Sequence, residues 1–329
     1  MRESATEIAV ARSPVDHFSV TMSPDPIRGE AIREFAHAVR DFHPAYRDAT
    51  RTGLPALVAP ATFGATILTG VQRDILGSLI PDGSPDRILH VDQVLDLRRP
   101  LVEGDQLICR AHVESLRYFA DYHVLTIRAA LIDQQGAIAQ TATTSLLTRI
   151  GGEHCRAVVH EHATARGAAY ADSISGPRPR MLSRAIDIDE LTVGFELPPW
   201  TVELRGGDLV RYAELTGTAD PPLVADGPYG SAGADPVLTP STFELGLAAT
   251  FLTSRLGVRT VLTRLRTQSA RHTHYLTLSS LDFAVVELRG HVTALDTPHR
   301  RVTVAMTAHA NGRALFSYAT AELQIPQSS

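Results

Sequence analysis

Residues 32–46 read IREFAHAVRDFHPAY, and residues 209–223 read LVRYAELTGTADPPL. The two stretches align without a gap, because Phe35 falls on Tyr212 at an offset of 177 residues (212 − 35). In the first stretch, apolar residues recur at the spacing of one helix face, and a proline follows where the helix has to end. The same arrangement twice in one chain suggests that a whole domain is repeated.

Two further matches support a duplication. Residues 59–63, APATF, recur as 239–243, TPSTF, at an offset of 180 residues (239 − 59). Gly136 and the residues after it match Gly312 and the residues after it, at an offset of 176 residues (312 − 136). Three matches in the same order and at nearly constant offset predict a tandem repeat of a domain of about 150 residues.

The composition is that of an ordinary globular protein. Of the 329 residues, 44% are apolar and 20% are charged, and each half is long enough to bury a core of its own. The formal charge of −5 provides no chain-wide basic field for nucleic acid or anionic lipid. The chain shows neither a signal peptide nor an apolar run of about 20 residues, so we expect a cytoplasmic protein.

The basic and sulfur-containing side chains exclude several kinds of site. All 31 residues counted as Lys or Arg are Arg, which excludes a Lys Schiff base. The two cysteines, Cys109 and Cys155, suggest neither a disulfide framework nor a metal-ligand spacing. We therefore expect no metal ion and no cofactor.

Hydrophobic periodicity predicts one element order for both halves: a short amphipathic helix, a more apolar helix and a run of strands. Pro26 and Pro60 are placed to open the first two helices. The predicted helices cover 26–43, 60–79, 207–216 and 240–256. The predicted strands cover 87–98, 105–118, 122–133, 137–149, 261–270, 281–295, 300–310 and 313–325.

An apolar helix followed by long antiparallel strands predicts a sheet curled round that helix. One such unit leaves a sheet edge open, whereas two units side by side can share a continuous sheet. The fold class is therefore α+β, with two antiparallel sheets, each wrapped round a central helix, joined into one. The predicted divisions are a leader at 1–17, a first domain at 18–150, a linker at 151–192 and a second domain at 193–327.

The stretch ILHVDQVLDLRRPLVEGDQLICRAHVESL, residues 88–116, resembles the non-catalytic half of MaoC-like (3R)-hydroxyacyl-thioester dehydratases. The FAxAV pattern that starts at Phe35 and VAPATF at 58–63 resemble the same half, and residues 201–325 are similar to the catalytic half. The resemblance implies a double hot-dog fold, as if the two subunits of a heterodimeric dehydratase had been fused. It also implies removal or addition of water at C2–C3 of an acyl chain held as a CoA or carrier-protein thioester.

The family places its catalytic Asp and His five residues apart in a G-D-x-N-P-I-H loop. In the second half, Thr218 stands at the Asp position and Leu223 at the His position. Asp220 is the ionisable residue left inside this loop, and burial would make it a candidate acid or base. The resemblance therefore predicts a degenerate active site in the second half.

The first half retains more of the loop. Asp41 stands at the family's Asp position, Tyr46 at its His position and His43 between them at its Asn position. An Asp–Tyr pair can carry acid–base chemistry, with His43 contacting substrate. Alternatively, these residues cap and brace the end of the preceding helix.

Further polar residues are candidates for substrate binding. His90 either faces the tunnel of the other half or is a hydrogen-bonded structural histidine. Arg264 and Arg266 share one strand face and either meet a phosphate or carboxylate or face solvent. Hydroxyl groups near the second apolar helix either bind a ligand or cap the helix, namely those of Thr218, Thr239, Ser241 and Thr242.

Three functions remain open. The first is a diverged hydratase or dehydratase acting on an acyl or polyketide-type thioester. The second is a repurposed hot-dog enzyme that cyclises or isomerises a polyketide-like substrate without the Asp/His pair, and the third is a non-catalytic acyl-binding subunit. Each has an acyl-CoA or acyl-carrier-protein partner, no nucleic acid or membrane partner, and a monomeric pseudo-dimer or homodimer as its assembly. Fold alone does not choose among them.

Overall fold

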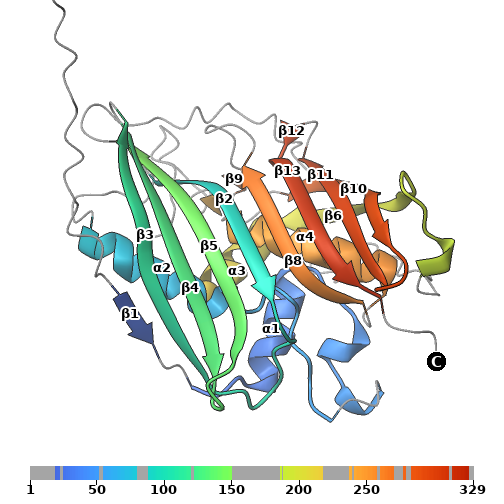
Figure 1. The fold of residues 1–329 in the computed structure, drawn as a ribbon, viewed down its shortest axis with the longest axis horizontal. Helices are drawn as coiled ribbons and strands as arrows, with labels where there is room; N and C mark the ends of the chain where they lie inside the picture. Colours follow the sequence, from blue (N-terminus) through green and yellow to red (C-terminus); the bar gives the residue numbers. More distant parts are fainter. Residues whose placement is uncertain are drawn as a thin grey trace, which may run out of the picture.

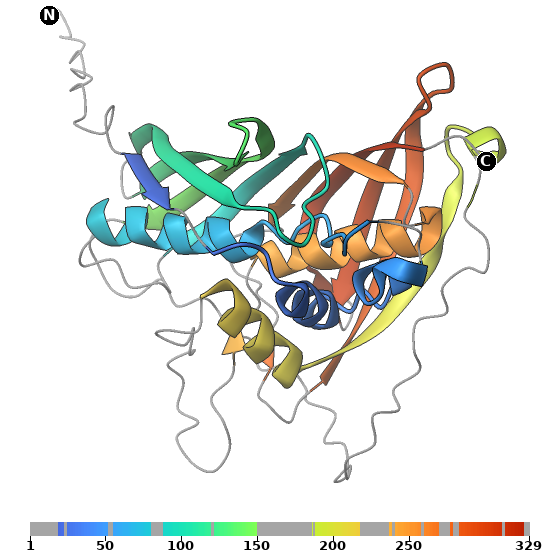
Figure 2. The same ribbon diagram turned by 90° about the horizontal axis from the view of Figure 1, so that it is seen from below.

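The computed structural model describes residues 19–22, 25–51, 55–79, 88–119, 122–149, 186, 188–217, 237–238, 241–257, 260–269, 277–278, 283–310 and 313–325. One antiparallel sheet of 11 strands dominates the molecule, and helices pack on its inner face (Figures 1 and 2). Two short strands, β7 and β9, form a separate pair. The predicted joining of two antiparallel sheets into one is confirmed.

The strand order of the large sheet is β1-β3-β4-β5-β2-β8-β13-β11-β10-β6, and β12 pairs with β11. The helical elements are α1 (Gly29–Ala38), η2 (Pro44–Tyr46), η3 (Ala49–Arg51), α2 (Ala65–Leu79), η5 (Ile188–Glu190), α3 (Gly206–Thr216) and α4 (Ser241–Leu256). The strands of the first half are β1 (Ser19–Met22), β2 (Ile88–Leu97), β3 (Leu107–Phe119), β4 (Tyr122–Asp133) and β5 (Ile138–Arg149). Those of the second half are β6 (Glu196–Arg205), β7 (Val237–Leu238), β8 (Val261–Ser269), β9 (Thr277–Leu278), β10 (Phe283–Asp296), β11 (Arg301–Ala310), β12 (Arg313–Ala314) and β13 (Phe316–Gln324).

The sheet repeats itself about a central seam. Reading outward from β2 gives β5, β4, β3 and β1, and reading outward from β8 gives β13, β11, β10 and β6. Figure 1 shows the two halves side by side, with β2 and β8 meeting in the middle. The two copies of the duplicated domain are thus related by a pseudo-twofold axis through the strand pair β2–β8.

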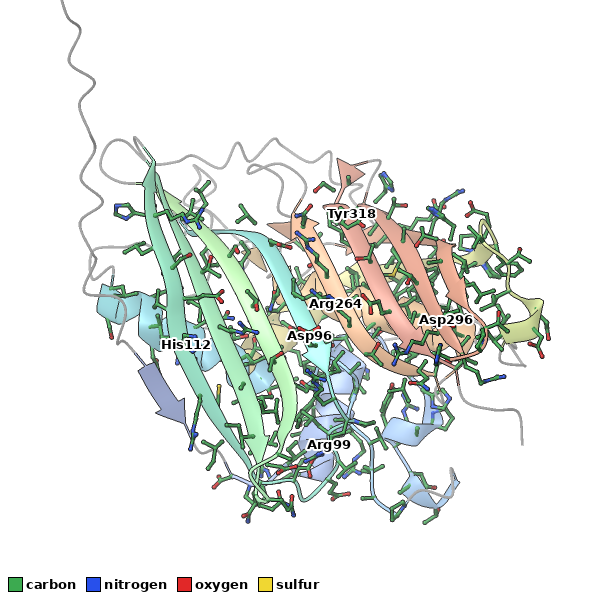
Figure 3. The ribbon with its side chains drawn as sticks, in the orientation of Figure 1. Asp96, Arg99, His112, Arg264, Asp296 and Tyr318 are labelled. Atoms are coloured by element: carbon green, nitrogen blue, oxygen red, sulfur yellow. The ribbon has the colours of Figure 1, made fainter. Side chains whose placement is uncertain are left out.

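Ion pairs reinforce this seam on the outer face of the sheet. Arg266 binds Asp92 through two hydrogen bonds of 2.9 Å, and Arg264 binds Asp96 at 2.9 Å. Figure 3 labels Asp96 and Arg264, which lie on the adjacent strands. These groups are partly exposed, so each pair contributes at most about 1 kcal/mol. Their main effect is to fix the register of the two halves.

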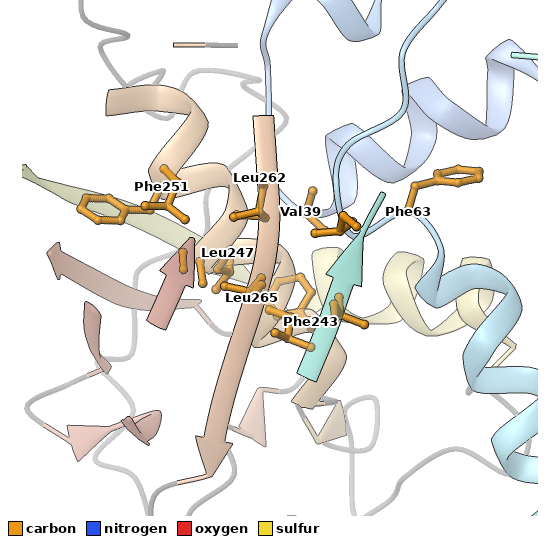
Figure 4. Packing of buried hydrophobic residues seen from close by; sticks show 14 of the residues in the cluster. Val39, Phe63, Phe243, Leu247, Phe251, Leu262 and Leu265 are labelled. Carbon is orange, nitrogen blue, oxygen red and sulfur yellow. The ribbon is translucent and has the colours of Figure 1, made fainter. Parts of the chain in front are cut away.

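Aromatic side chains join the halves in the core. The Phe35 ring lies 5.4 Å from the Phe63 ring and 5.7 Å from the Tyr212 ring, and Tyr212 lies 5.1 Å from Phe243. The repeat relates Phe35 to Tyr212 and Phe63 to Phe243, so the cluster straddles the pseudo-twofold axis. Figure 4 shows Phe63 and Phe243 within the buried cluster. Burial of each such ring contributes on the order of 2–3 kcal/mol.

Three helix boundaries differ from the sequence prediction. The first helix begins at Gly29 rather than 26, and it ends at Ala38 rather than 43, because Arg40 adopts a left-handed conformation with φ 61°. Residues 61–64 form turns, so the second helix begins at Ala65 rather than at Pro60. The other predicted helices begin and end within one residue of the predicted positions.

Strand β6 was absent from the sequence prediction. Its segment ELPPWTVELR contains Pro198 and Pro199, which are poor residues for a central strand. β6 is an edge strand that pairs with β10, and the register shifts where the two prolines stand, between the pairs Trp200–Leu288 and Leu197–Gly290. The structure thus tolerates the prolines at an edge and a bulge.

The predicted linker is partly described. Ile188 and Leu191, in its C-terminal part, are 0% and 3% exposed, so this part of the chain packs into the core. Residues 151–185 lie outside the described residues. The domain boundaries therefore stay a prediction. In the described part of the chain, no helix is long and apolar enough to cross a membrane.

Candidate functional site

The end of α1 positions the candidate acid–base residues of the first half. The Asp41 N–H bonds the Ala36 carbonyl at 2.8 Å, and the Arg40 N–H bonds the His37 carbonyl at 3.1 Å. Together with the left-handed conformation of Arg40, these bonds form a Schellman motif. The turn carries the Asp41 side chain into the protein, where the residue is 7% exposed.

Asp41 is held from both halves of the molecule. Thr253 of α4 donates its hydroxyl to Asp41 Oδ2 at 3.0 Å, and the His43 N–H donates to Asp41 Oδ1 at 3.3 Å. Tyr46 lies near this carboxyl and also lowers its pKa. Burial raises the pKa of Asp41 to about 7, although these hydrogen bonds act in the opposite direction. At neutral pH the group therefore exists in both protonation states.

Tyr46 differs from Asp41 in its protonation. The residue is 3% exposed in η2. Burial, followed by the nearby Asp41 charge, raises the pKa of the Tyr46 hydroxyl well above its usual value. Tyr46 therefore remains neutral and can donate or relay a proton, but it does not act as a phenolate base.

His43 supports the turn between these two residues. Its Nδ1 accepts a hydrogen bond from the Ala45 N–H at 3.0 Å and thereby caps η2. Burial lowers the pKa of the His43 imidazole, which favours the neutral form that accepts this bond. The structure brings together the predicted residues Asp41, His43 and Tyr46, and it gives His43 a bracing contact.

The C-terminal half completes this site through α4. Thr250 donates its hydroxyl to the Val39 carbonyl at 3.0 Å, which satisfies a carbonyl at the end of α1. Three residues further on, Thr253 reaches Asp41. Gly246 lies against Val39 so closely that an added Cβ would be 2.6 Å from Val39 Cγ1. The missing side chain at Gly246 therefore allows α4 to approach α1.

An open pocket lies beside this site, between the two halves. Its polar side chains are those of Tyr46, Arg99, Gln140, Thr253 and Thr260, and the rest of its wall is apolar. Asp41 lies behind the hydroxyls of Tyr46 and Thr253 and is not part of the wall. Apolar cavities with few convergent polar groups are typical small-molecule sites.

Arg99 is fixed at the cavity wall by two carboxylates. It bonds Asp105 at 2.7 and 3.2 Å and Asp133 at 3.1 and 3.3 Å. The hydrogen bond to Asp105 is the largest of the effects that raise the pKa of Arg99. Figure 3 shows Arg99 at one end of the sheet. Because both carboxylates compensate the charge of Arg99, its side chain forms a fixed part of the cavity wall and is not a free cation.

The remaining predicted residues are more dispersed. Thr218, Asp220, Leu223 and Thr239 lie outside the described residues, as does the side chain of Ser241. Thr242 is 4% exposed, and its hydroxyl has no hydrogen-bond partner within the described part of the chain. Arg264 and Arg266 pair with carboxylates on the outer face, away from the cavity. His90 lies on β2 opposite Leu146 of the neighbouring strand.

Two residues of interest were absent from the sequence prediction. Thr253 lies 212 residues from Asp41 in the sequence, and no local sequence pattern predicts their contact. Glu244 is 3% exposed in the first turn of α4, and burial raises the pKa of its carboxyl well above the usual value. A single acid in the apolar run STFELGLAATFL was a signal for Glu244. Within the described ranges, no three His, Cys, Asp or Glu residues gather to hold a metal ion.

A family profile and two sequence relatives match part of this chain. The profile of the FAS1-like dehydratase domain region matches residues 17–142. A UPF0336 protein of Streptomyces coelicolor is 32% identical over 149 residues, which cover 44% of this chain and 99% of the relative. A UPF0336 protein of Mycobacterium tuberculosis is 34% identical over 143 residues, which cover 43% of this chain and 80% of the relative.

Solved structures match nearly the whole chain. A structure described as a MaoC-like dehydratase has a TM-score of 0.72 at 26% identity and covers 94% of this chain and 98% of its own. A conserved hypothetical protein of Mycobacterium tuberculosis with a double hotdog fold has a TM-score of 0.59 at 13% identity, over 94% of this chain and 95% of its own. The predicted double hot-dog architecture is confirmed.

Proposed function

This chain belongs to the MaoC-like hot-dog dehydratase family, and on this basis we propose that it exchanges water across the C2–C3 bond of an acyl thioester. The acyl chain, held on CoA or a carrier protein, occupies the cavity between the two halves. The leucines of the cavity wall, among them Leu97, Leu252 and Leu262, provide the apolar surface. Each buried methylene of the chain contributes about 0.8 kcal/mol to binding.

One observation carries the chemical part of the proposal. Tyr46 and Thr253 line the cavity, the Thr253 hydroxyl bonds the carboxyl of Asp41 behind them, and Tyr46 lies near enough to lower the pKa of that carboxyl. A carboxyl with a pKa near 7 is matched to proton transfer at neutral pH. The two hydroxyls therefore connect the cavity to a proton reservoir, and Asp41 acts through them without touching substrate.

In the hydration direction, Asp41 alone takes up and returns the one proton that the reaction transfers. A cavity water gives a proton to one hydroxyl, that hydroxyl passes its own proton to Asp41, and the water oxygen bonds to C3. The proton then returns through the hydroxyl to C2. One O–H bond of water and the C2–C3 π bond are lost, a C–O and a C–H bond form, and Asp41 regains its starting state. Dehydration is the reverse.

Thr253 is suited to such a relay because its hydroxyl has alternative acceptors. The oxygen lies 3.1 Å from the Ala249 carbonyl and 3.1 Å from the Thr250 carbonyl, in addition to its bond with Asp41. A hydroxyl has one proton and two lone pairs. When Asp41 is protonated, Thr253 can turn its proton to the helix and accept the proton of the carboxyl.

The test is hydration of trans-2-octenoyl-CoA, followed by loss of its enoyl absorbance. We expect turnover by the natural protein and a loss of 100-fold or more, on the order expected for acid–base groups, in Tyr46→Phe. Asp25→Asn is the control, because Asp25 is exposed and distant in sequence from the cavity residues. Tight octenoyl-CoA binding without turnover by the natural protein would contradict the chemical proposal and leave acyl binding as the function.

A further inference from the structure

A group of basic side chains lies on the outer side of the turn that carries Asp41 and Tyr46. Both of these residues are buried, whereas Arg47, directly after Tyr46, is exposed and Arg40, directly before Asp41, is partly exposed. Arg211 of α3 reaches the same place from the opposite half, because α1 and α3 pack against each other (Figure 2). We call Arg40, Arg47 and Arg211 the arginine cluster.

Two rings hold these guanidinium groups in place. The guanidinium carbons of Arg40 and Arg47 lie 5.1 and 5.4 Å from the centre of the Phe42 ring, within the range of a cation–π contact. The Arg211 guanidinium donates to Nδ1 of His37 at 3.2 Å, and the His37 ring lies 5.5 Å from the Phe42 ring. Because an arginine can only donate, His37 is neutral in this contact and carries its proton on Nε2. The three guanidinium groups are therefore held around two adjacent rings.

The arginine cluster has an excess of positive charge. Among the residues that the structure describes, Asp208 is the one carboxylate that pairs with it, at 3.7 Å from Arg40. Three guanidinium groups and one carboxylate leave a net charge of +2 (3 − 1 = 2). Burial lowers the pKa of His37 most, and the charges of the arginine cluster lower it further. The electrostatic field at His37 is therefore positive.

The arginine cluster differs from other exposed arginines of the molecule. Arg128 and Arg289 each pair with a glutamate. Arg47 and Arg211 have no ion pair with any carboxylate in the described part of the chain. Arg40 Nε is fully buried, and no described residue accepts a hydrogen bond from it. A buried donor without an acceptor is unfavourable, and a bound anion would supply the acceptor.

The duplication alone does not produce this charge. His37 and Arg211 correspond to Glu214 and Glu34 at the offset of 177 residues (214 − 37 and 211 − 34). Both glutamates are exposed. The positions that carry basic groups on one side of the pseudo-twofold axis therefore carry acidic groups on the other. The positive charge is a property of the first-half turn and not of the repeated fold.

We infer that the arginine cluster is a binding site for a phosphate group, carried either by the CoA part of a thioester or by a separate phosphate compound. Guanidinium groups match phosphate oxygens with paired hydrogen bonds, and the net charge of the cluster matches a phosphate dianion. His37 retains one further N–H donor, at Nε2. None of the three arginines lines the described cavity, so a phosphate bound to them leaves the cavity free.

Calorimetric titration of pyrophosphate into the full chain at low ionic strength tests the site. We expect the natural protein to bind pyrophosphate, and Arg47→Gln and Arg211→Gln each to weaken this binding about three- to tenfold, because each removes a charge-assisted contact. Arg128→Gln removes the same charge from the outer face of the sheet and should leave the affinity unchanged. Asp208→Asn should strengthen the binding, because it removes the carboxylate that competes for Arg40.

Absence of pyrophosphate binding by the natural protein would overturn the inference. Equal losses in Arg128→Gln and in the cluster variants would do the same, because they would show a general attraction to charge. Pyrophosphate carries no acyl chain, so these results do not depend on the proposed function. A second titration in saturating CoA identifies the source of the phosphate: CoA displaces pyrophosphate if its own phosphates take the site, and pyrophosphate still binds if the site serves a separate phosphate compound.

Discussion

Arg40 and Gly217 adopt the same left-handed backbone conformation at the ends of equivalent helices, with φ angles of 61° and 67°. Glycine takes this conformation freely, whereas an arginine there costs about 1 kcal/mol or more. Arg40 obtains partial compensation, because its guanidinium lies 3.7 Å from Asp208 of α3 and 5.1 Å from the centre of the Phe42 ring. The first half thus carries strain directly before Asp41.

Replacing Arg40 should reveal this strain. Arg40→Gly and Arg40→Ala both remove the guanidinium, but only glycine relaxes the left-handed backbone. We expect the glycine variant to be more stable than the alanine variant by about 1 kcal/mol in urea unfolding. Inside a helix the order is the opposite, because alanine stabilises a helix more than glycine does. Equal stability, or a more stable alanine variant, would show that the turn is not strained.

The close approach of α4 to α1 gives a packing prediction. In Gly246→Ala, the new Cβ would lie 2.6 Å from Val39 Cγ1, and we expect a loss of about 1–3 kcal/mol in the free energy of unfolding. Adding Val39→Ala should recover part of this loss, so that the double mutant is more stable than the sum of the single changes implies.

Gly77→Ala is the matched control, because no atom lies within 4 Å of a Cβ added at Gly77 in α2. It should stabilise the protein by about 0.5–1 kcal/mol. A neutral Gly246→Ala substitution would mean that the helices are less tightly packed than described.

The raised pKa of Asp41 predicts a dependence of stability on pH. Because the pKa rises from 3.8 to about 7 on folding, the folded state favours the protonated carboxyl. Its contribution to stability is full below about pH 4, falls as the pH rises to about 7 and is constant above that, with a total change of at most about 4 kcal/mol.

Asp41→Asn should remove this dependence. The difference in unfolding free energy between natural protein and variant, measured in urea from pH 4.5 to 8, should shift in favour of the variant up to about pH 7 and stay constant above it. Other buried acids, such as Glu244, titrate in both proteins and cancel in this difference. A difference that is constant with pH would contradict a raised pKa at Asp41.

The hydroxyl of Thr253 should tune the same carboxyl. Its hydrogen bond is the largest of the effects that lower the pKa of Asp41 against burial. Thr253→Val should therefore raise the pKa of Asp41 further, and Thr253→Ser should leave it nearly unchanged. A carbon-13 NMR titration of the Asp41 carboxyl measures both. An unchanged pKa in Thr253→Val would show that this hydrogen bond does not reach the carboxyl in solution.

Much of the fold was predictable because it depends on local periodicity and on repetition. The apolar runs of α2 and α4 and the long strands β3, β4, β10 and β11 carry their patterns within single segments. Strand β6 escaped prediction because Pro198 and Pro199 contradict strand propensity, and only the position of β6 at the sheet edge explains them.

The site was predictable only in part. Asp41, His43 and Tyr46 lie within six residues of one another, and one short pattern contains them all. Thr253 was not predictable, because its contact with Asp41 depends on how two distant halves pack. The same packing determines that Arg264 and Arg266 meet Asp96 and Asp92 on the outer face, which strand periodicity alone left open.

The pH dependence of kcat/KM for hydration of trans-2-octenoyl-CoA tests the central claim most directly, because it reports the ionisation of the free protein. For a reaction that uses the Asp41 carboxylate through Tyr46 and Thr253, the rate should rise with pH and level off above about pH 7. Asp41→Asn should lose about 100-fold or more, and any residual rate should no longer change near that pH. An unchanged rate and pH profile in Asp41→Asn would contradict the account.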